Sequence, residues 1–116
     1  MHPYEQALRE SYAAFNAGDL PAAGAYLSDD AEWPDQLEGG LLHGREAIQA
    51  YWERLGKITQ HHYEVVNAIV DDQGTVVTNL LRTVRALDGR VLSHGLIRHA
   101  YTFRADGKVA RMEMLF

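Results

Sequence analysis

The chain has 116 residues, of which 47% are hydrophobic, and a formal net charge of −5. This length suits a single domain with its own core, and we expect that domain to span residues 1–116. The negative charge argues against a nucleic-acid partner, and the absence of cysteine excludes disulfides, thiolate metal sites and a cysteine nucleophile. No apolar run reaches the roughly 20 residues of a membrane span, and the first residues lack the pattern of a signal peptide. We therefore expect a cytoplasmic protein without a membrane partner.

The first part of the chain has the spacing of helices. Large apolar residues recur at helical intervals over residues 3–17: Tyr4, Leu8, Tyr12 and Phe15. Gly18 is expected to end this helix, and Asp19 is a candidate N-cap for a short second helix that reaches about residue 27. A short strand over 31–35 and a turn at 38–40 should precede a third helix over 45–57.

The second part of the chain changes to the two-residue period of strands. Three or four strands are expected, at about 62–70, 75–87, 91–104 and 108–116. The dipeptide Asp88-Gly89 between two alternating runs is a strong hairpin signal. Helices followed by long antiparallel strands predict an α+β fold, with the helices on one face of a curved sheet. A bent sheet covered by helices leaves a cavity at one end.

Several motifs resemble those of a known family. They are Phe15-Asn16-Ala17-Gly18-Asp19, Asp29-Asp30-Ala31-Glu32-Trp33, Gly44-Arg45-Glu46-Ala47-Ile48 with Tyr51-Trp52, and Phe103-Arg104-Ala105-Asp106-Gly107-Lys108-Val109. Their order resembles the SnoaL-like and ketosteroid-isomerase-like branch of the nuclear transport factor 2-like (NTF2-like) superfamily. The resemblance implies a cone of three N-terminal helices on a curved, mainly antiparallel sheet. Such domains include isomerases, polyketide cyclases, dehydratases, epoxide hydrolases and domains without known catalysis, so the resemblance does not select an activity.

Asp35 is the first candidate for chemistry. It lies two positions after Trp33, so both side chains point to the same face of a strand. An indole keeps water away from a neighbouring carboxylate, which disfavours its charged form and suits a general base. The resemblance places the proton-shuttling acid of ketosteroid isomerases at this position. The alternative is an acid that stabilises a turn at the strand end after Pro34.

The resemblance also locates the two donors that hold an enolate oxygen in the isomerases, and here the chain differs. The position of the donor tyrosine corresponds to Ser11, with Tyr12 beside it, and the position of the protonated acid corresponds to His99. A serine and a histidine do not form an efficient oxyanion hole, which argues against a steroid isomerase. Asp35 and His99 facing one cavity would suit elimination, cyclisation or isomerisation next to a carbonyl. The alternative for His99 is a hydrogen-bonded histidine of the core.

We expect these residues to line a hydrophobic pocket. The side chains predicted to contact a substrate are Ser11, Tyr12, Trp33, His43, Tyr51, Trp52, Leu81, Ile97, Tyr101, Met112, Met114 and Phe116. Methionine suits irregular apolar ligands, although a packed core would use the same residues. In the strand over 75–87, we expect the side chains of the odd-numbered residues to face the cavity: Asn79, Leu81 and Thr83. If Arg82 or Arg98 points inward instead, an Asp–Arg arrangement like that of epoxide hydrolases becomes possible.

Cofactor motifs are missing from the sequence. It has no histidine pair at the spacing of a helical metal site and no glycine-rich nucleotide loop, so we expect neither a metal nor another cofactor. Two classes of function stay open. The first is a cofactor-independent acid–base enzyme (isomerase, cyclase or dehydratase type) acting on a small hydrophobic molecule with a carbonyl group. The second is a ligand-binding or dimerisation domain without chemistry. For either class we expect a homodimer, because a long sheet with apolar residues on both sides must cover its outer face.

Overall fold

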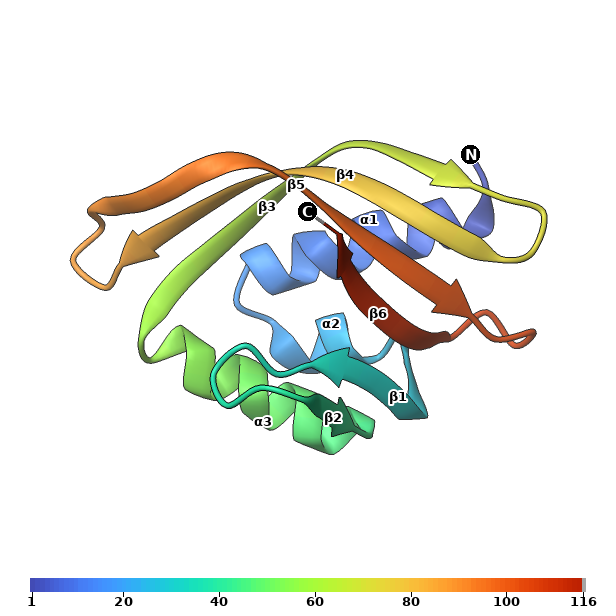
Figure 1. The fold of residues 1–116 in the computed structure, drawn as a ribbon, viewed down its shortest axis with the longest axis horizontal. Coiled ribbons are helices and arrows are strands. Elements are labelled where there is room, and N and C mark those ends of the chain that lie inside the picture. The colour runs from blue at the N-terminus through green and yellow to red at the C-terminus, as the bar shows by residue number, and fades with distance from the viewer. Residues whose placement is uncertain (116) are drawn as a thin grey trace.

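A computed structural model describes residues 1–115 of the chain. Helices and strands follow in the order α1 (Pro3–Asn16), α2 (Leu20–Gly24), β1 (Leu27–Pro34), β2 (Leu41–His43), α3 (Arg45–Gly56), β3 (Thr59–Val70), β4 (Thr75–Ala86), β5 (Val91–Phe103) and β6 (Val109–Leu115). The strands form one six-stranded sheet in the order β2-β1-β6-β5-β4-β3. The sheet is curved, and α1 lies beneath the arch of its long strands (Figure 1). The chain is therefore α+β, with helices against the concave face of a mixed sheet.

The first helix begins at the predicted residue and ends one residue earlier than predicted. His2 Nδ1 accepts the N–H of Tyr4 at 3.0 Å, which satisfies one of the free amides of the first turn. Leu8 and Tyr12 are buried along one face of α1, as the spacing of the apolar residues indicates. Gly18, at φ +79°, then turns the chain toward α2.

The long strands form the predicted antiparallel meander. β4 pairs with β3 on one side and with β5 on the other, and β5 pairs with β6. The turn between β4 and β5 lies at Asp88-Gly89, where Gly89 adopts φ +92° and Asp88 Oδ1 accepts the N–H of Arg90 at 2.9 Å. The hairpin signal in the sequence is thus confirmed.

The face of β4 that meets the helices is the even-numbered one. Val76, Thr78 and Leu80 have no exposed surface. Thr78 lies directly opposite His99 in β5, and residues that lie opposite each other share a face of the sheet. The prediction that the odd-numbered set faces the cavity is wrong: Leu81 lies opposite Leu96, which is 74% exposed. Both sides of this strand carry apolar residues, so their alternation alone does not identify the inner face.

The segment between α2 and α3 differs from the prediction. β1 begins at Leu27, and β2 is a three-residue strand where only a loop was expected. Trp33 in β1 pairs with Leu42 in β2, and β1 also runs parallel to β6. A strand of this length is too short to show a period in sequence, and it forms because β1 offers it a hydrogen-bonding edge.

One side chain joins α1 to the sheet. The Asn16 amide donates to the carbonyl oxygen of Tyr63 at 2.7 Å and accepts the N–H of the same residue at 2.9 Å. Tyr63 belongs to β3, which is the last strand at that edge of the sheet. This pair of bonds places the end of α1, and with it Tyr12 and Phe15, over the inner face of the sheet.

Candidate ligand-binding and active site

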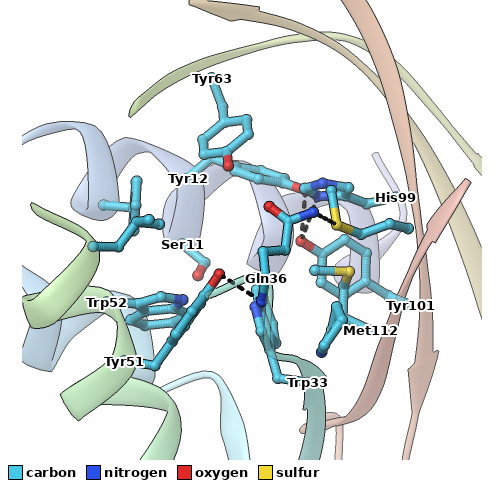
Figure 2. A pocket seen from close by; sticks show the side chains of 14 residues that line it. Ser11, Tyr12, Trp33, Gln36, Tyr51, Trp52, Tyr63, His99, Tyr101 and Met112 are labelled. Atoms are coloured by element: carbon cyan, nitrogen blue, oxygen red, sulfur yellow. Dashed lines mark hydrogen bonds between the residues drawn. The ribbon is translucent and has the colours of Figure 1, made fainter. Parts of the chain in front are cut away.

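The helices and the inner face of the sheet enclose one aromatic pocket. Its free volume is about 50 Å³, well below that of typical small-molecule sites, so a ligand would have to displace lining side chains. The side chains that line it come from α1, α3, the β1–β2 segment and strands β3, β5 and β6 (Figure 2). They are Ser11, Tyr12, Phe15, Trp33, Pro34, Gln36, Tyr51, Trp52, Leu55, Tyr63, His99, Tyr101, Met112 and Met114.

Most of the residues predicted to contact a substrate meet in this pocket. These are Ser11, Tyr12, Trp33, Tyr51, Trp52, Tyr101, Met112 and Met114, together with His99. A role of these residues in binding or catalysis stays a prediction. The hydroxyl of Ser11 is already engaged, because it donates to the carbonyl oxygen of Ala23 at 3.0 Å and so joins α1 to α2.

Other predicted residues lie elsewhere. His43 is on β2 with its side chain 69% exposed, 3.9 Å from the carboxylate of Glu32. Leu81 faces away from the helices, as described above. Ile97 lies on the inner face opposite Leu80, and it packs against the core without lining the pocket. Phe116 lies outside the described residues.

Sequence reasoning missed five lining residues. These are Phe15, Pro34, Gln36, Leu55 and Tyr63. Phe15 and Leu55 carry a signal, since both occupy apolar positions of predicted helices. Tyr63 would follow from the register of β3, where it lies opposite Arg82 on the inner face. Gln36 carries no signal, because an isolated polar residue in a turn has no pattern that indicates its direction.

Asp35 is nearly buried, at 9% exposure, but it does not line the pocket. Its Oδ1 atom accepts the N–H groups of Leu37 and Glu38, at 2.9 and 3.0 Å. This is the geometry of an aspartate that closes a turn, in which the carboxylate replaces a backbone acceptor. The expectation that Asp35 and Trp33 would face the cavity together is therefore not met. The chain leaves the strand at Pro34, and the alternation of faces ends there.

A cluster of buried polar groups lies at the sheet end of the pocket. The hydroxyl of Tyr12 is its centre: it lies 3.0 Å from His99 Nδ1 and 3.3 Å from Thr78 Oγ1, and it also bonds the hydroxyl of Tyr101. One arrangement lets each phenol donate once, from Tyr101 to Tyr12 and from Tyr12 to His99 Nδ1. In that arrangement His99 carries its proton on Nε2. The reverse direction of donation gives the other tautomer.

His99 holds the one unpaired buried side-chain atom of the described chain. The residue is 3% exposed, and its Nε2 atom has no hydrogen-bond partner among residues 1–115. Burial in an apolar surrounding lowers the pKa of His99 to about 4, and the positive charge of Arg82 acts in the same direction. The imidazole is therefore neutral at pH 7, and Nε2 is a free donor or acceptor of a residue that lines the pocket.

The phenols around His99 are neutral as well. Burial raises the pKa of Tyr12 and of Tyr101 well above the ordinary value, and it raises the pKa of Tyr63 to about 12. Among residues 1–115, no aspartate or glutamate lines the pocket. The site as built is thus an uncharged aromatic pocket with one unsatisfied imidazole nitrogen.

The arginines do not complete an epoxide-hydrolase arrangement. Arg82 is on the inner face, opposite Tyr63, whereas Arg98 lies opposite Asn79 on the outer face. Neither guanidinium lines the pocket, and Asp35 does not line it either. An Asp–Arg pair facing a common ligand is therefore absent from the part of the chain that the structure describes.

No group of three histidine, aspartate or glutamate side chains in residues 1–115 is arranged to hold a metal ion. None of the helices in the same range is long and apolar enough to cross a membrane.

Known proteins share this fold. Residues 8–112 match the family model described as the SnoaL-like domain. An NTF2-like protein of unknown function from Burkholderia pseudomallei is 28% identical, with a TM-score of 0.86 over 100% of this chain and 92% of that one. TerC, whose crystal structure was obtained with polyporic acid, is 26% identical, with a TM-score of 0.85 over 99% and 92% of the two chains.

A more distant structure shares the fold alone. Rv0760c from Mycobacterium tuberculosis, solved in complex with estradiol-17β-hemisuccinate, is 16% identical, with a TM-score of 0.85 over 100% of this chain and 95% of that one. No curated protein sequence matches the chain. The family match covers nearly all of the domain, from the middle of α1 into β6, and the chain belongs to the SnoaL-like family of the NTF2-like superfamily.

Proposed function

We propose that this protein is a cofactor-independent enzyme that moves a proton next to a carbonyl group of a small hydrophobic molecule. The reaction is an isomerisation, a cyclisation or an elimination. One observation carries the proposal: His99 lines an aromatic pocket, and its Nε2 atom is buried without a hydrogen-bond partner among residues 1–115. Natural proteins satisfy nearly all buried polar atoms, so an orphan nitrogen at such a place marks a position for a ligand.

The chemistry follows from the two hydrogen-bonding states of Tyr12. When His99 Nδ1 carries the proton and donates to Tyr12, Nε2 is a base that can remove a proton from the carbon beside the carbonyl. The electron pair of that C–H bond forms an enolate, and the imidazolium then returns the proton to another carbon or to a leaving oxygen. When Tyr12 donates to Nδ1 instead, Nε2–H is a donor for the carbonyl oxygen.

The low pKa of His99 sets the cost of this step. Protonation of His99 in the empty pocket at pH 7 lies about three pKa units uphill, which corresponds to about 4 kcal/mol. An enolate formed beside the imidazolium offsets part of that cost, because opposite charges attract strongly where water is excluded. The pocket therefore suits substrates with a carbonyl that holds the negative charge close to Nε2.

The pocket also indicates the class of substrate. Aromatic rings and the sulfur atoms of Met112 and Met114 form its walls, which suits a flat apolar molecule with a single polar end. One relative with a bound molecule supports this direction: TerC, which is 26% identical, was crystallised with polyporic acid.

Hydrogen–deuterium exchange tests the first chemical step without knowledge of the substrate. Acetonaphthone, a flat aromatic methyl ketone, is incubated with the protein in D₂O, and loss of the methyl proton signal is followed by NMR. The protein should accelerate this exchange, and His99→Gln should reduce the acceleration about a hundredfold or more, as expected for loss of an acid–base group. His94→Gln is the matched control, because His94 is an exposed histidine of the same strand. Equal rates for His99→Gln and the wild-type protein would refute the role of His99.

A ligand-binding domain without chemistry is the second candidate. It is favoured by the lack of any carboxylate among the pocket-lining residues of the described chain, since a neutral imidazole is a weak base on its own. In this case acetonaphthone should quench tryptophan fluorescence, because Trp33 and Trp52 both line the pocket, but its methyl protons should exchange no faster than in buffer.

We also propose a homodimer that forms through the outer face of the sheet. Leu96 is 74% exposed and Ile69 is 63% exposed, and both lie on the face away from the helices. Sedimentation should give about twice the chain mass of 13.0 kDa for the wild-type protein. Leu96→Asp should give the monomer mass. Leu87→Asp, in an exposed leucine at the hairpin turn, is the control and should stay dimeric. A monomeric wild-type protein would end this proposal.

A further inference from the structure

The side chain of Gln36 crosses the pocket. Its Nε2 atom donates to the sulfur of Met114, and Met114 is the residue of β6 that lies opposite His99. Figure 2 shows the glutamine extended from its turn, past Trp33 and Tyr51, toward His99. The Gln36 amide thus lies at the same end of the pocket as His99.

The bond that holds this amide is a poor one. A thioether sulfur is a weak acceptor, and within residues 1–115 the Gln36 amide has no other side-chain partner. A carbonyl oxygen of a ligand is a much better acceptor for the same N–H group. Replacing the hydrogen bond to the Met114 sulfur by one to a ligand oxygen would therefore cost little free energy. The same ligand oxygen would satisfy both Gln36 and His99.

Hydrogen bonds hold the backbone that carries Gln36. Asp35 Oδ1 accepts two N–H groups of the turn, and the N–H of Asp35 donates to the carbonyl oxygen of Gly40 at 3.0 Å. The N–H of Gln36 itself donates to the Tyr51 hydroxyl at 3.3 Å. These bonds hold the turn at the mouth of the pocket, so the direction in which Gln36 leaves the backbone is set by the Asp35 carboxylate.

We propose that Gln36 is a second hydrogen-bond donor to the polar oxygen of the ligand, beside His99, and that Asp35 is the positioning residue that presents it. Gln36 is an exposed residue that lines the pocket, and its side chain turns onto the ligand when one binds. The site then selects flat apolar molecules that carry an acceptor at the His99 end. This inference rests on the proposed function only in taking this pocket as the ligand site.

The test compares two molecules of similar shape. Acetonaphthone has a carbonyl oxygen, and ethylnaphthalene has none. Binding of each is measured by quenching of Trp33 and Trp52, the two tryptophans of the chain. The wild-type protein should bind the ketone more tightly by about tenfold, and Gln36→Leu should lose most of that preference while binding ethylnaphthalene at least as well. Gln73→Leu, in the exposed turn between β3 and β4, should behave like the wild-type protein. If Gln36→Leu keeps the full preference for the ketone, the inference is wrong.

Two substitutions of Asp35 test its role as a positioning residue. The side-chain oxygen of asparagine can still accept the N–H groups of Leu37 and Glu38, so Asp35→Asn should retain both the ketone preference and the proton exchange. Asp35→Ala should lose the preference. If Asp35 is instead the catalytic base, Asp35→Asn abolishes exchange as completely as Asp35→Ala does, and the positioning role is overturned.

The two proposals fail in different ways. Binding with a ketone preference that depends on Gln36, but without proton exchange, would refute the enzyme and leave the donor role of Gln36 intact. Proton exchange that depends on His99, with an unaltered ketone preference in Gln36→Leu, would refute the donor role of Gln36 and leave the enzyme proposal intact.

Discussion

Acidification should destabilise the fold through His99. The ordinary pKa of histidine is 6.5, and burial lowers that of His99 to about 4 in the native state. The unfolded chain therefore takes up a proton at this residue between these two values, while the native protein does not. The contribution of His99 is fully present above pH 6.5, is lost progressively as the pH falls, and is gone below about pH 4. A difference of about 2.5 pKa units corresponds to about 3 kcal/mol of unfolding free energy.

Urea unfolding at a series of pH values measures this contribution. Tryptophan fluorescence reports the transition, since both tryptophans lie in the core around the pocket. The free energy of unfolding of the wild-type protein should fall more steeply between pH 6.5 and 4 than that of His99→Gln, and the gap should change by about 3 kcal/mol. Acidic residues and the other histidines titrate in both proteins and cancel in the difference. His94→Gln should follow the wild-type curve. Parallel curves for the wild-type protein and His99→Gln would refute the claim that His99 is held neutral by burial.

Four further outcomes are expected. The exchange activity should stay constant from pH 7 to about pH 5 and fall through about pH 4, where His99 becomes protonated; a midpoint near 6.5 would show a solvated histidine instead. Tyr12→Phe removes the hydroxyl that contacts Thr78, His99 and Tyr101. It should lower the free energy of unfolding in urea by about 2 kcal/mol. Tyr26→Phe, at an exposed hydroxyl, should lower it by less than about 0.5 kcal/mol. Asn16→Ala breaks two bonds to the Tyr63 backbone and should cost about 2 kcal/mol; an unchanged midpoint would contradict the anchoring role of Asn16. A methyl group at Gly24 would meet the side chain of Gln49, so Gly24→Ala should lower stability by about 1 kcal/mol and the added change Gln49→Ala should restore it; no recovery in the double variant would place the strain elsewhere.

Much of the fold could be predicted from local patterns. The spacing of Leu8 and Tyr12 identified the buried face of α1, and Asp88-Gly89 identified the central hairpin. These signals depend on neighbours in sequence, where helix and turn geometry is fixed by few residues. The inner face of β4 could not be predicted in this way. Which face of β4 meets the helices depends on the pairing of Thr78 with His99, a contact between residues far apart in the chain.

The site was predictable in its walls and not in its chemistry. Aromatic residues at core positions of α1 and α3 line the pocket as expected. Asp35 and Gln36 are adjacent, however, and the turn directs their side chains differently. The Asp35 carboxylate accepts hydrogen bonds from the turn backbone, and the Gln36 amide enters the pocket. No periodicity extends across a turn, so the sequence offers no means of telling which of the two reaches a ligand.

The bonds between Asn16 and Tyr63 have a consequence for self-association. β3 ends the sheet, and an outer strand of this kind can recruit a strand from another molecule through its free peptide groups. At Tyr63 both peptide groups are already occupied, because the carboxamide of Asn16 pairs with them as an added strand would. The first helix thus supplies a one-residue cap to the sheet. Loss of that cap in Asn16→Ala should promote growth of β-rich aggregates, which thioflavin fluorescence would detect.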